Sequence, residues 1–449
     1  MLLGTQRVNE RGHLEIGGCD AVSLAAEFGT PLYVLDEAAV RRACREYRRA
    51  FESRYPRNVI CYASKAFLTF AMARIVAEEG LSLDVAALGE LYTALRAGFP
   101  SRRINLHGNN KSREELEMAV RRRVGHVVLD HLAEIDQLAA LARSHRRRVA
   151  VLVRCAPGVD PDTHRFIRTG QADTKFGLNI HDGSALEGVR RVLASANLRF
   201  DGIHCHIGSQ ILDAASHTEA VQEMVAFMAS IREATGALCD IVNIGGGLGV
   251  RYRSTDRPPA FDEFAESICS RLHDSLRTFG LPLPILQQEP GRAIVGEAGT
   301  TLYTVGVVKT VPVTGGPGRR TYVAIDGGLS DNPRPQLYGA VYEVVAANRA
   351  GEPHDRTISV AGKHCETDVL VRDAKCAPVE PGDVLAVQTT GAYNHSMASN
   401  YNRMLRPAVV LVNDGRADLI VERERLEDLV RREVVPERLR ARGRAPVAV

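Results

Sequence analysis

Residues 59–66 read Val59-Ile60-Cys61-Tyr62-Ala63-Ser64-Lys65-Ala66, and they contain the first clear strand of the chain. The apolar, β-forming run predicts a short buried strand, and Lys65 follows directly after it. Only six of the 57 basic residues are lysines. A partly buried lysine, unlike an arginine, can lose its proton and attack a carbonyl carbon to form a Schiff base. Lys65 is therefore a candidate nucleophile, set against the commoner case of a surface lysine after a strand.

The strand at 58–63 is the first of eight short β-rich runs that alternate with helix-like segments. One further helix precedes them, with Asp36 as its predicted N-cap, and Gly80, Gly98 and Gly280 each follow a helical pattern that they would end. Eight βα repeats over about 230 residues predict a closed (β/α)8 TIM-type barrel, and an open doubly wound sheet is the alternative. The expected strands are 58–63, 81–86, 103–107, 125–129, 148–154, 200–206, 239–244 and 283–288; the expected helices are 67–79, 89–97, 112–122, 131–145, 184–196, 214–235 and 261–279.

The pattern changes after residue 297, where β-rich runs are joined by Gly/Pro turns with few helices between them. Such a pattern is typical of an antiparallel sheet, either a β-sandwich or a barrel-like fold. A further strand at 32–35 and the rest of the N-terminal segment are expected to join this sheet. We therefore predict an α/β protein with a barrel domain over 36–297 and a sheet domain formed by 1–35 and 298–449. The expected strands of the second half are 303–308, 321–325, 357–361, 384–387 and 408–412.

The composition is that of an ordinary globular protein, with 45% hydrophobic and 25% charged residues. A net charge of +3 is too balanced to indicate a nucleic-acid partner, so a small-molecule substrate is expected. Nine cysteines without CxxC pairs indicate neither a disulfide framework nor a zinc ribbon, and free thiols favour the cytoplasm. The sequence shows no signal-peptide pattern and no apolar run of about 18 residues, so no membrane association is predicted.

Nearly every expected barrel strand ends at a polar or glycine-rich group. Barrel enzymes carry their chemistry on the loops at the carboxyl ends of their strands, so these groups are expected to face one another. In chain order they are Lys65, Asp84, His107-Gly108-Asn109-Asn110, Asp130, Arg154, His204-Cys205-His206-Ile207-Gly208-Ser209, Gly245-Gly246-Gly247-Leu248-Gly249 and Glu289-Pro290-Gly291-Arg292.

Three of these groups have more than one interpretation. The Gly245–Gly249 run suits close approach of a phosphate or is simply a flexible turn, and it does not match the dinucleotide-binding fingerprint. His204 and His206 point to the same side of a strand, where they could bind zinc; His204 could instead pack inside the barrel and His206 could stack on an aromatic cofactor. Glu289 could hold a pyridine nitrogen protonated or form a loop salt bridge with Arg292.

Taken together, these elements resemble bacterial diaminopimelate decarboxylases, members of the fold-type III, alanine-racemase-like group of enzymes that use pyridoxal 5'-phosphate. The resemblance extends from about residue 20 to residue 415, and no metal is implied by it. It rests on the ordered motifs YASKAF, HGNNKS, KFGLN, HCHIGSQI, NIGGGLG, EPGR, DGGLSDNPRPQLYGA, GKHCE and GAYNHSMASNYN.

The resemblance implies a role for each of several residues. Lys65 would bind pyridoxal phosphate covalently, His206 would stack on its ring, and Glu289 would pair with its ring nitrogen. Cys365 would donate the proton that replaces the lost carboxylate, because a thiol pKa of about 8.5 leaves a proton available near neutral pH. The remaining residues implied around the cofactor phosphate or the nearby substrate group are Ser209, Gly246, Gly247, Gly291, Arg292 and Tyr393.

The resemblance also implies a homodimer with shared active sites. Cys365 and Glu366, together with Tyr393, would reach the site from the partner chain. The family's Cys-Glu-Ser-x-Asp motif is one residue shorter here, as Cys365-Glu366-Thr367-Asp368, and its Asp-Val-Ala-Ser motif is here Asp84-Val85-Ala86-Ala87. Neither change removes a catalytic group.

The substrate follows from the residues that would bind its far end. Two guanidinium groups, from Arg292 and Arg334, match a distal carboxylate, which diaminopimelate has and ornithine lacks. Tyr338 and Tyr393 would add hydroxyl groups, and Glu366 would accept the distal ammonium. The implied reaction is decarboxylation of meso-2,6-diaminopimelate to L-lysine and CO2, the last step of lysine biosynthesis. The alternatives are a decarboxylase of ornithine, arginine or carboxynorspermidine type, a non-catalytic regulatory relative, and a zinc hydrolase.

Overall fold

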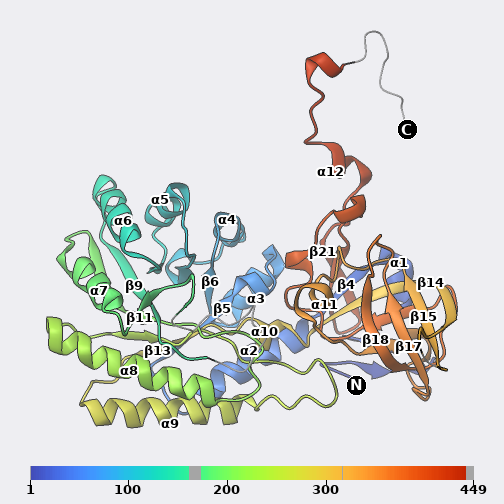
Figure 1. Ribbon diagram of the computed structural model, residues 1–449, viewed down its shortest axis with the longest axis horizontal. Helices are drawn as coiled ribbons and strands as arrows, with labels where there is room; N and C mark the ends of the chain where they lie inside the picture. Colours follow the sequence, from blue (N-terminus) through green and yellow to red (C-terminus); the bar gives the residue numbers. More distant parts are fainter. Residues whose placement is uncertain (1, 161–172, 316, 441–449) are drawn as a thin grey trace.

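The computed structural model describes residues 2–160, 173–315 and 317–440. Figure 1 shows two bodies side by side, a helix-covered barrel and a body made mostly of strands. The chain crosses between them more than once, because the N-terminal segment lies with the C-terminal strands.

Eight parallel strands form the barrel, in the order β5-β6-β7-β8-β9-β11-β12-β13. β13 pairs with β5, and β8 pairs with β9, so the sheet closes on itself. The prediction of a (β/α)8 barrel is confirmed, and the open-sheet alternative is wrong because it requires two free edges. The strands are β5 (Asn58–Ala63), β6 (Ser82–Val85), β7 (Ile104–Leu106), β8 (His126–Leu129), β9 (Val149–Ala156), β11 (Leu198–His204), β12 (Ile241–Asn243) and β13 (Ile285–Gln288), with the short β10 (Leu178–Asn179) added beside β9.

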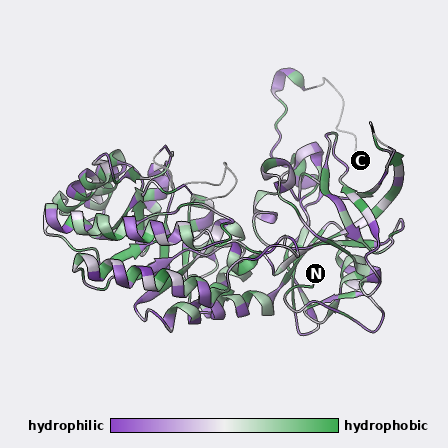
Figure 2. Cartoon of the chain, turned by 60° about the horizontal axis from the view of Figure 1, so that its bottom comes forward, coloured by the Kyte–Doolittle hydropathy of each residue, from purple (hydrophilic) through white to green (hydrophobic). Residues whose placement is uncertain are grey.

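Capping residues set the ends of the outer helices. Ser112 and Glu115 form a reciprocal capping box at the start of α5. Gly80, Gly98 and Gly280 have positive φ angles of 82°, 82° and 58° just after α3, α4 and α9, as their positions predict. Figure 2 shows hydrophilic and hydrophobic residues alternating along these helices. They are α2 (Glu37–Glu52), α3 (Phe70–Glu78), α4 (Leu88–Arg96), α5 (Arg113–Arg122), α6 (Leu132–Ser144), α7 (Ser184–Ala194), α8 (Ala215–Thr235), α9 (Phe261–Phe279) and α10 (Arg292–Val295).

The inside of the barrel changes from apolar to polar along its axis. Val128, Leu152 and Ile241 form a small apolar cluster within it. Asn243 lies two residues after Ile241 in β12, on the same side of the strand. Its side-chain amide donates to Gln287 Oε1 at 3.2 Å. The polar layer therefore lies toward the carboxyl ends of the strands, where the sequence places its chemical groups.

The second body is built on a sheet in the order β18-β17-β15-β14-β4-β20-β21, with β19 pairing with both β14 and β16. Most pairs are antiparallel, as predicted, but β15–β17 and β4–β20 are parallel, which the turn pattern did not reveal. All five expected strands are present; β16, β18 and β21 were missed. The bounds are β4 (Leu32–Asp36), β14 (Gly299–Pro312), β15 (Arg319–Ile325), β16 (Val344–Ala346), β17 (Arg356–Ala361), β18 (Val369–Cys376), β19 (Val384–Val387), β20 (Ala408–Asn413) and β21 (Arg416–Val421).

The strand β4 joins the two bodies. It hydrogen-bonds with β14 and β20 and leads directly into α2, which packs on the barrel. Asp36, the predicted N-cap, accepts from the backbone N–H of Ala39 at 2.9 Å, and its other oxygen accepts from Thr5 at 2.8 Å. One carboxylate thus fixes both the helix start and the N-terminal segment.

The remaining elements lie on the outside of the sheet body. A small three-stranded sheet precedes α1 near the N-terminus, and a short helix, α12, projects from the body near the C-terminus (Figure 1). Within the described ranges, no helix combines the length and the apolar character needed to cross a membrane. These elements are β1 (Arg7–Val8), β2 (Leu14–Ile16), β3 (Cys19–Asp20), α1 (Ala21–Phe28), α11 (Arg334–Tyr338) and α12 (Leu426–Val430).

Candidate active site

Lys65 lies in a single 3-10 turn, Ser64–Ala66, immediately after β5 at the mouth of the barrel. Its Nζ is 3.5 Å from Asp84 Oδ2, and its side chain is 42% exposed while Asp84 is buried. Burial lowers the pKa of the Lys65 ammonium, but Asp84 and Glu289 raise it by more, so that it stands above its usual range. The strand-end prediction for Lys65 is confirmed, and its Nζ faces the barrel mouth beside a carboxylate.

Glu289 is buried at the carboxyl end of β13 and has three polar neighbours. His204 Nε2 lies 3.1 Å from one carboxylate oxygen, and His107 Nε2 and the amide of Asn243 lie 3.0 Å and 2.7 Å from the other. Burial raises the pKa of Glu289, but the two histidines lower it by more, and it stands well below its usual range. The group is a carboxylate in the middle of the barrel, and the alternative interpretation, a loop salt bridge with Arg292, is wrong because Glu289 contacts His204, His107 and Asn243 instead.

The two histidines of the HCH motif have different surroundings. His204 contacts Glu289, whereas His206 Nδ1 accepts from the backbone N–H of Gly246 at 3.2 Å. Burial lowers the pKa of His204 to about 4, and burial together with the charge of Lys65 lowers that of His206 well below its usual value. His206 is thus a flat, neutral ring beside Lys65, which suits stacking on an aromatic ring.

The histidines that come together are therefore not the pair that the sequence motif suggested for zinc. His107, His204 and Glu289 have ligand atoms within 4.8 Å of one another, and His206 is outside this group. The second histidine of the group, His107, comes from the end of another barrel strand, β7. Its side chain lies in the layer directly beneath the mouth and touches His204, with ring centroids 4.8 Å apart.

Glycines let the loops after β12 and β13 approach each other closely. A Cβ atom on Gly246 would lie 2.1 Å from the carbonyl oxygen of Glu289, and one on Gly291 would lie 3.0 Å from the Cβ of Ala63. Gly247 has a φ of 120°, in the region that favours glycine. These positions admit no side chain, so backbone lines this part of the mouth, as expected for a surface that receives a phosphate.

Two arginines, Arg292 and Arg334, are buried at the mouth, with exposures of 4% and 5%. Arg292 donates to Ser209 Oγ at 2.9 Å and to the hydroxyl of Tyr252, while its buried Nε has no hydrogen-bond partner among the residues that the structure describes. Arg334 Nε donates to the hydroxyl of Tyr342 at 3.1 Å. Both guanidinium groups also lie 5.7 Å from the centre of the Tyr252 ring.

Neither guanidinium has a carboxylate within ion-pair distance in the part of the chain that the structure describes. Burying a cation without an anion costs several kcal/mol. Lining by tyrosine rings and hydroxyls offsets only part of that cost. An anion supplied from outside the chain is therefore the expected partner of these two groups.

Tyr393 belongs to the same chain's site, and the expectation that it comes from a partner is wrong. Its backbone N–H donates to the carbonyl of Ala66, next to Lys65, at 2.8 Å. Arg292 lies 4.7 Å and Arg334 5.7 Å from the centre of its ring. The reason is that the loop after β19 folds back onto the turn that carries Lys65, which distance along the sequence did not show.

Cys365 and Glu366 lie on the sheet body rather than at the barrel mouth, whereas Tyr338 shares the short helix α11 with Arg334. Tyr338 ends α11, where Arg334 lies 5.5 Å from its ring centre. Cys365 is exposed, whereas the other eight cysteines are buried. Among the described residues, no hydrogen bond or ion pair joins Cys365 or Glu366 to Lys65.

Comparison with known proteins identifies the family. Residues 37–296 match the family model described as "Pyridoxal-dependent decarboxylase, pyridoxal binding domain". Diaminopimelate decarboxylase of Bacillus subtilis (strain 168) is 48% identical over 96% of this chain and 97% of its own length. The chain belongs to the diaminopimelate decarboxylases. The diaminopimelate decarboxylase of Mycobacterium tuberculosis (strain CDC 1551 / Oshkosh) is 45% identical over 95% of this chain and 96% of its own.

Solved structures agree with this assignment. Diaminopimelate decarboxylase from M. jannaschii, in complex with L-lysine, superimposes with a TM-score of 0.90 and 34% identity, covering 98% of this chain and all of the other. A lysine/ornithine decarboxylase from Vibrio vulnificus reaches a TM-score of 0.72 at 23% identity, which shows a shared fold only. The diaminopimelate decarboxylase fold is thus common to both bodies of this chain.

The residues at the mouth of this decarboxylase fit pyridoxal phosphate. An ionised carboxylate, Glu289, suits a protonated ring nitrogen, and the neutral ring of His206 suits the ring face. The glycine-lined backbone leaves room for a phosphate, and Arg292 Nε is a buried donor without an acceptor in the described part of the chain. Lys65 Nζ is the amine that the cofactor's aldehyde requires.

Several residues of the decarboxylase site were not among the sequence-based candidates. Asp84, His107 and Arg154 were noted only as strand ends, a position that already marked them. Arg154 lies 3.6 Å from Asp130 and over the ring of Phe176. Asn243 stands in the quoted motif NIGGGLG without having been given a role, and Tyr252 gave no signal because it belongs to no spacing pattern. Only the fold brings Tyr252 to the two arginines.

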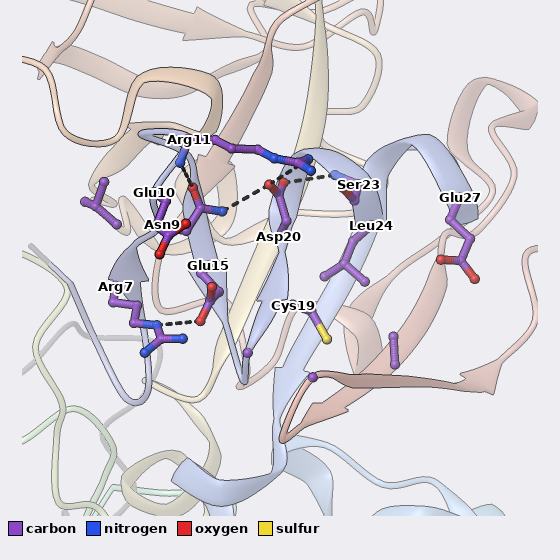
Figure 3. Close-up of a pocket in the computed structure, with 14 residues that line it drawn as sticks. Arg7, Asn9, Glu10, Arg11, Glu15, Cys19, Asp20, Ser23, Leu24 and Glu27 are labelled. Carbon is purple, nitrogen blue, oxygen red and sulfur yellow. Dashed lines mark hydrogen bonds and ion pairs between the residues drawn. The ribbon is translucent and has the colours of Figure 1, made fainter.

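A cavity of about 760 Å³ lies elsewhere, beside the N-terminal strands β1–β3 and the helix α1. Figure 3 shows that charged side chains line it, and that Arg7 and Arg11 point toward Glu15 and Asp20. The Arg7 Nε–Glu15 distance is 2.5 Å, and Arg11 Nη1 lies 4.0 Å from Asp20. Because these arginines already face carboxylates, size alone does not make this cavity the active site.

Proposed function

We propose that this diaminopimelate decarboxylase binds meso-2,6-diaminopimelate with the distal carboxylate between Arg292 and Arg334. The observation that carries the proposal is the pair of buried guanidinium groups without a carboxylate partner. A bidentate arginine–carboxylate pair is strong and directional, and two such groups select a substrate whose far end is an anion. Ornithine ends in an ammonium alone and would leave both arginines unpaired, so the ornithine-type alternative is disfavoured.

The reaction is the pyridoxal-phosphate-dependent loss of CO2 that gives L-lysine. The bound cofactor supplies an aldehyde for the substrate amine and a ring that accepts the electrons left by the departing carboxylate. Lys65 Nζ would provide its covalent attachment, and Glu289, kept ionised by His107 and His204, would accept the hydrogen bond of its ring nitrogen. His206 would cover the ring face. Ser209 and the backbone at Gly246, Gly247 and Gly291 would surround the phosphate.

Cys365 is proposed to deliver the proton to the carbon that loses CO2, and to do so in the partner's site. Its exposure on the sheet body and its lack of contact with Lys65 of the same chain support this role. Glu366, the next residue, would accept the distal ammonium of the substrate, with the hydroxyls of Tyr338 and Tyr393 beside it. A homodimer with two shared sites would follow, each built from the barrel mouth of one chain, together with that chain's Arg334 and Tyr393, and from the Cys365–Glu366 loop of the other chain.

The domain boundaries and the compartment are also proposals. We place the cofactor-binding barrel domain at 36–297 and the sheet domain at 1–35 and 298–449, since β4 pairs within the sheet while α2 packs on the barrel. Nine free cysteines favour a reducing compartment, the cytoplasm.

The decisive experiment is incubation of the purified protein with pyridoxal phosphate and meso-diaminopimelate, followed by detection of L-lysine. Lys65→Ala should lose both the activity and the visible absorbance of the bound cofactor, whereas Lys309→Ala, an exposed lysine on β14, should lose neither. Ornithine and arginine are offered in parallel. Turnover of either one in preference to diaminopimelate would overturn the proposed substrate.

The shared site is tested by mixing two inactive variants. Lys65→Ala and Cys365→Ala homodimers each lack one group, but a mixed dimer contains one complete site. Random exchange of subunits should restore about a quarter of the wild-type activity. No recovery after exchange, shown separately with tagged subunits, would contradict a site shared between chains.

A further inference from the structure

The loop that carries Cys365 and Glu366 is held by a second segment, the 3-10 turn Tyr401–Arg403. The hydroxyl of Tyr401 donates a hydrogen bond to Glu366 Oε1. The side-chain oxygen of Asn402 accepts from the backbone N–H of Cys365 at 3.4 Å. Two consecutive residues of one turn thus contact the two residues that are proposed to reach the partner's site.

The ring of Tyr401 is fixed even though 41% of the residue is exposed. It stacks on the ring of His364, with centroids 5.8 Å apart and planes within 9° of parallel. His364 is buried, and Asp368 Oδ2 lies 2.6 Å from its Nδ1. The backbone N–H of Ser330 donates to its other ring nitrogen at 3.3 Å. Because His364 is held on both nitrogens, it gives Tyr401 a rigid surface to rest on.

The turn itself is anchored from the other side. Arg403 donates from Nη1 to the carbonyl of Leu429 in α12 at 3.0 Å, and its Nη2 lies 2.5 Å from Glu433. Asn402 and Arg403 have φ angles of 50° and 57°, a backbone shape that must be held in place by such contacts. The position of the Tyr401 hydroxyl is therefore set by the fold rather than by Glu366.

We propose that Tyr401 is a positioning residue that orients the Glu366 carboxylate for the distal ammonium of the substrate. A carboxylate has two oxygens, and the Tyr401 hydroxyl binds Oε1, so Oε2 is the oxygen left to bind the ammonium. An exposed glutamate without such a partner samples several rotamers and binds an ammonium less well. The proposal rests on the role of Glu366 in the proposed function.

The structure favours this role over simple support of the loop. The loop backbone has its own hydrogen bonds, from Asn402 to Cys365 and from Gln336 Nε2 to the carbonyl of Thr367 at 3.0 Å. The Tyr401 hydroxyl contributes to none of them. Among the described residues its hydrogen-bond partner is the Glu366 carboxylate, so its removal should affect substrate recognition and leave the fold intact.

Tyr401→Phe tests the proposal, because phenylalanine keeps the ring on His364 and removes only the hydroxyl. We expect kcat/KM for meso-diaminopimelate to fall about 5- to 50-fold, mainly through a higher KM. For 2-aminopimelate of the reacting configuration, which keeps the distal carboxylate and lacks the distal amine, we expect the kinetic constants and the dissociation constant to change less than about 2-fold. Tyr92→Phe, an exposed tyrosine on α4, is the control.

A second variant separates positioning from structure. In a Glu366→Gln background, Tyr401→Phe should have no further effect on kcat/KM for meso-diaminopimelate. An equal loss on both substrates would show that the hydroxyl supports the site as a whole, and an unchanged constant for meso-diaminopimelate would show that it does nothing; either result overturns the inference. Failure of the wild-type enzyme to form lysine would instead refute the proposed function.

Discussion

Arginines line two hollows in the molecule, and their charges are paired with carboxylates in only one of the two. At the N-terminal cavity of Figure 3, Arg7 and Arg11 are 70% and 73% exposed, and each faces a carboxylate. At the barrel mouth, Arg292 and Arg334 are buried, and tyrosine hydroxyls and a serine take the place of carboxylates.

The difference shows which hollow is a binding site. An exposed ion pair contributes at most about 1 kcal/mol to the free energy of unfolding. The ion pairs of the N-terminal cavity therefore change the stability of the protein little. A buried cation without an anion is costly in the free protein, and a fold keeps one only where a ligand completes it. The buried arginines of the barrel mouth therefore lower the stability of the free protein and serve to bind a ligand. Substitution of these arginines should lower the activity without lowering the stability.

The largest effect is expected from Arg334→Met, which keeps the bulk of the side chain and removes its charge. Loss of a buried charge-assisted contact with the distal carboxylate should lower kcat/KM for meso-diaminopimelate by about 30- to 1,000-fold, equivalent to about 2–4 kcal/mol. Steady-state kinetics of the enzyme loaded with pyridoxal phosphate measures this effect.

The same variant makes a second, opposite prediction for stability. Removing an unpaired buried charge should leave the free energy of unfolding unchanged or raise it by about 1–3 kcal/mol in the absence of substrate, as urea titration would show. A clear loss of stability would mean that Arg334 holds the fold together, and the comparison between the two regions would fail.

A smaller effect is expected from a ligand that supplies only the missing anion. Pimelate carries the carboxylate of the substrate's far end without any amine. At about 100 times its dissociation constant it should stabilise the enzyme by about 2.7 kcal/mol. Thermal unfolding with and without pimelate measures this, and the Arg334→Met enzyme should show little shift. Equal stabilisation of both proteins would place the dicarboxylate elsewhere.

Most of the fold was predictable from the sequence because its strands and helices alternate with clear boundaries. Asp36, Gly80 and Gly280 stand where helices start or stop, and the eight strands follow from their spacing. The sheet body was less predictable, since Val344–Ala346 is short and Arg416–Val421 is interrupted by the charged residues Arg416 and Asp418 and has no buried residue. The parallel pairing of β4 with β20 joins segments that are distant in the sequence, and no local pattern encodes it.

The residues of the site also divide into those that local sequence patterns revealed and those that they did not. Lys65, Glu289 and Arg292 were found because each follows a barrel strand or belongs to a recognisable motif. The contact between His107 and Glu289 crosses the barrel, and the contact between Tyr393 and Arg292 crosses from one body to the other. Such contacts depend on closure of the sheet and on docking of the two bodies, so residue spacing could not reveal them. For Tyr393 the sequence argument placed the residue on the wrong chain.

A paired charge inside the barrel body should behave unlike the unpaired ones. Asp201, 10% exposed in its side chain, accepts from Arg199 at 2.6 Å and 2.7 Å and lies 3.1 Å from His126. Burial raises the pKa of Asp201, but these partners lower it by more, to about 2. A carboxylate with a lowered folded-state pKa adds stability that is present above its unfolded pKa of about 4 and disappears as the pH falls toward 2.

Asp201→Asn should therefore cost about 1–2 kcal/mol of unfolding free energy at pH 7, reduced from the full value of the pKa shift because Arg199 is 57% exposed. The difference from the wild-type enzyme should shrink as the pH falls from about 4 toward 2. Urea titrations across this range measure it, and kcat/KM at pH 7 should not change. A stability difference that is independent of pH would show that the carboxylate is not ionised in the fold.

The smallest effect is expected at the N-terminal cavity. Arg7→Met removes an exposed partner of Glu15 and should lower the free energy of unfolding by less than about 1 kcal/mol, with a still smaller difference in 1 M salt, where surface pairs are screened. Its kcat/KM for meso-diaminopimelate should equal that of the wild-type enzyme. This variant matches Arg334→Met in chemistry and differs only in place, so a loss of activity at Arg7 would show that the cavity of Figure 3 communicates with the barrel mouth. Equal activity would leave burial without an anion as the property that marks the functional arginines.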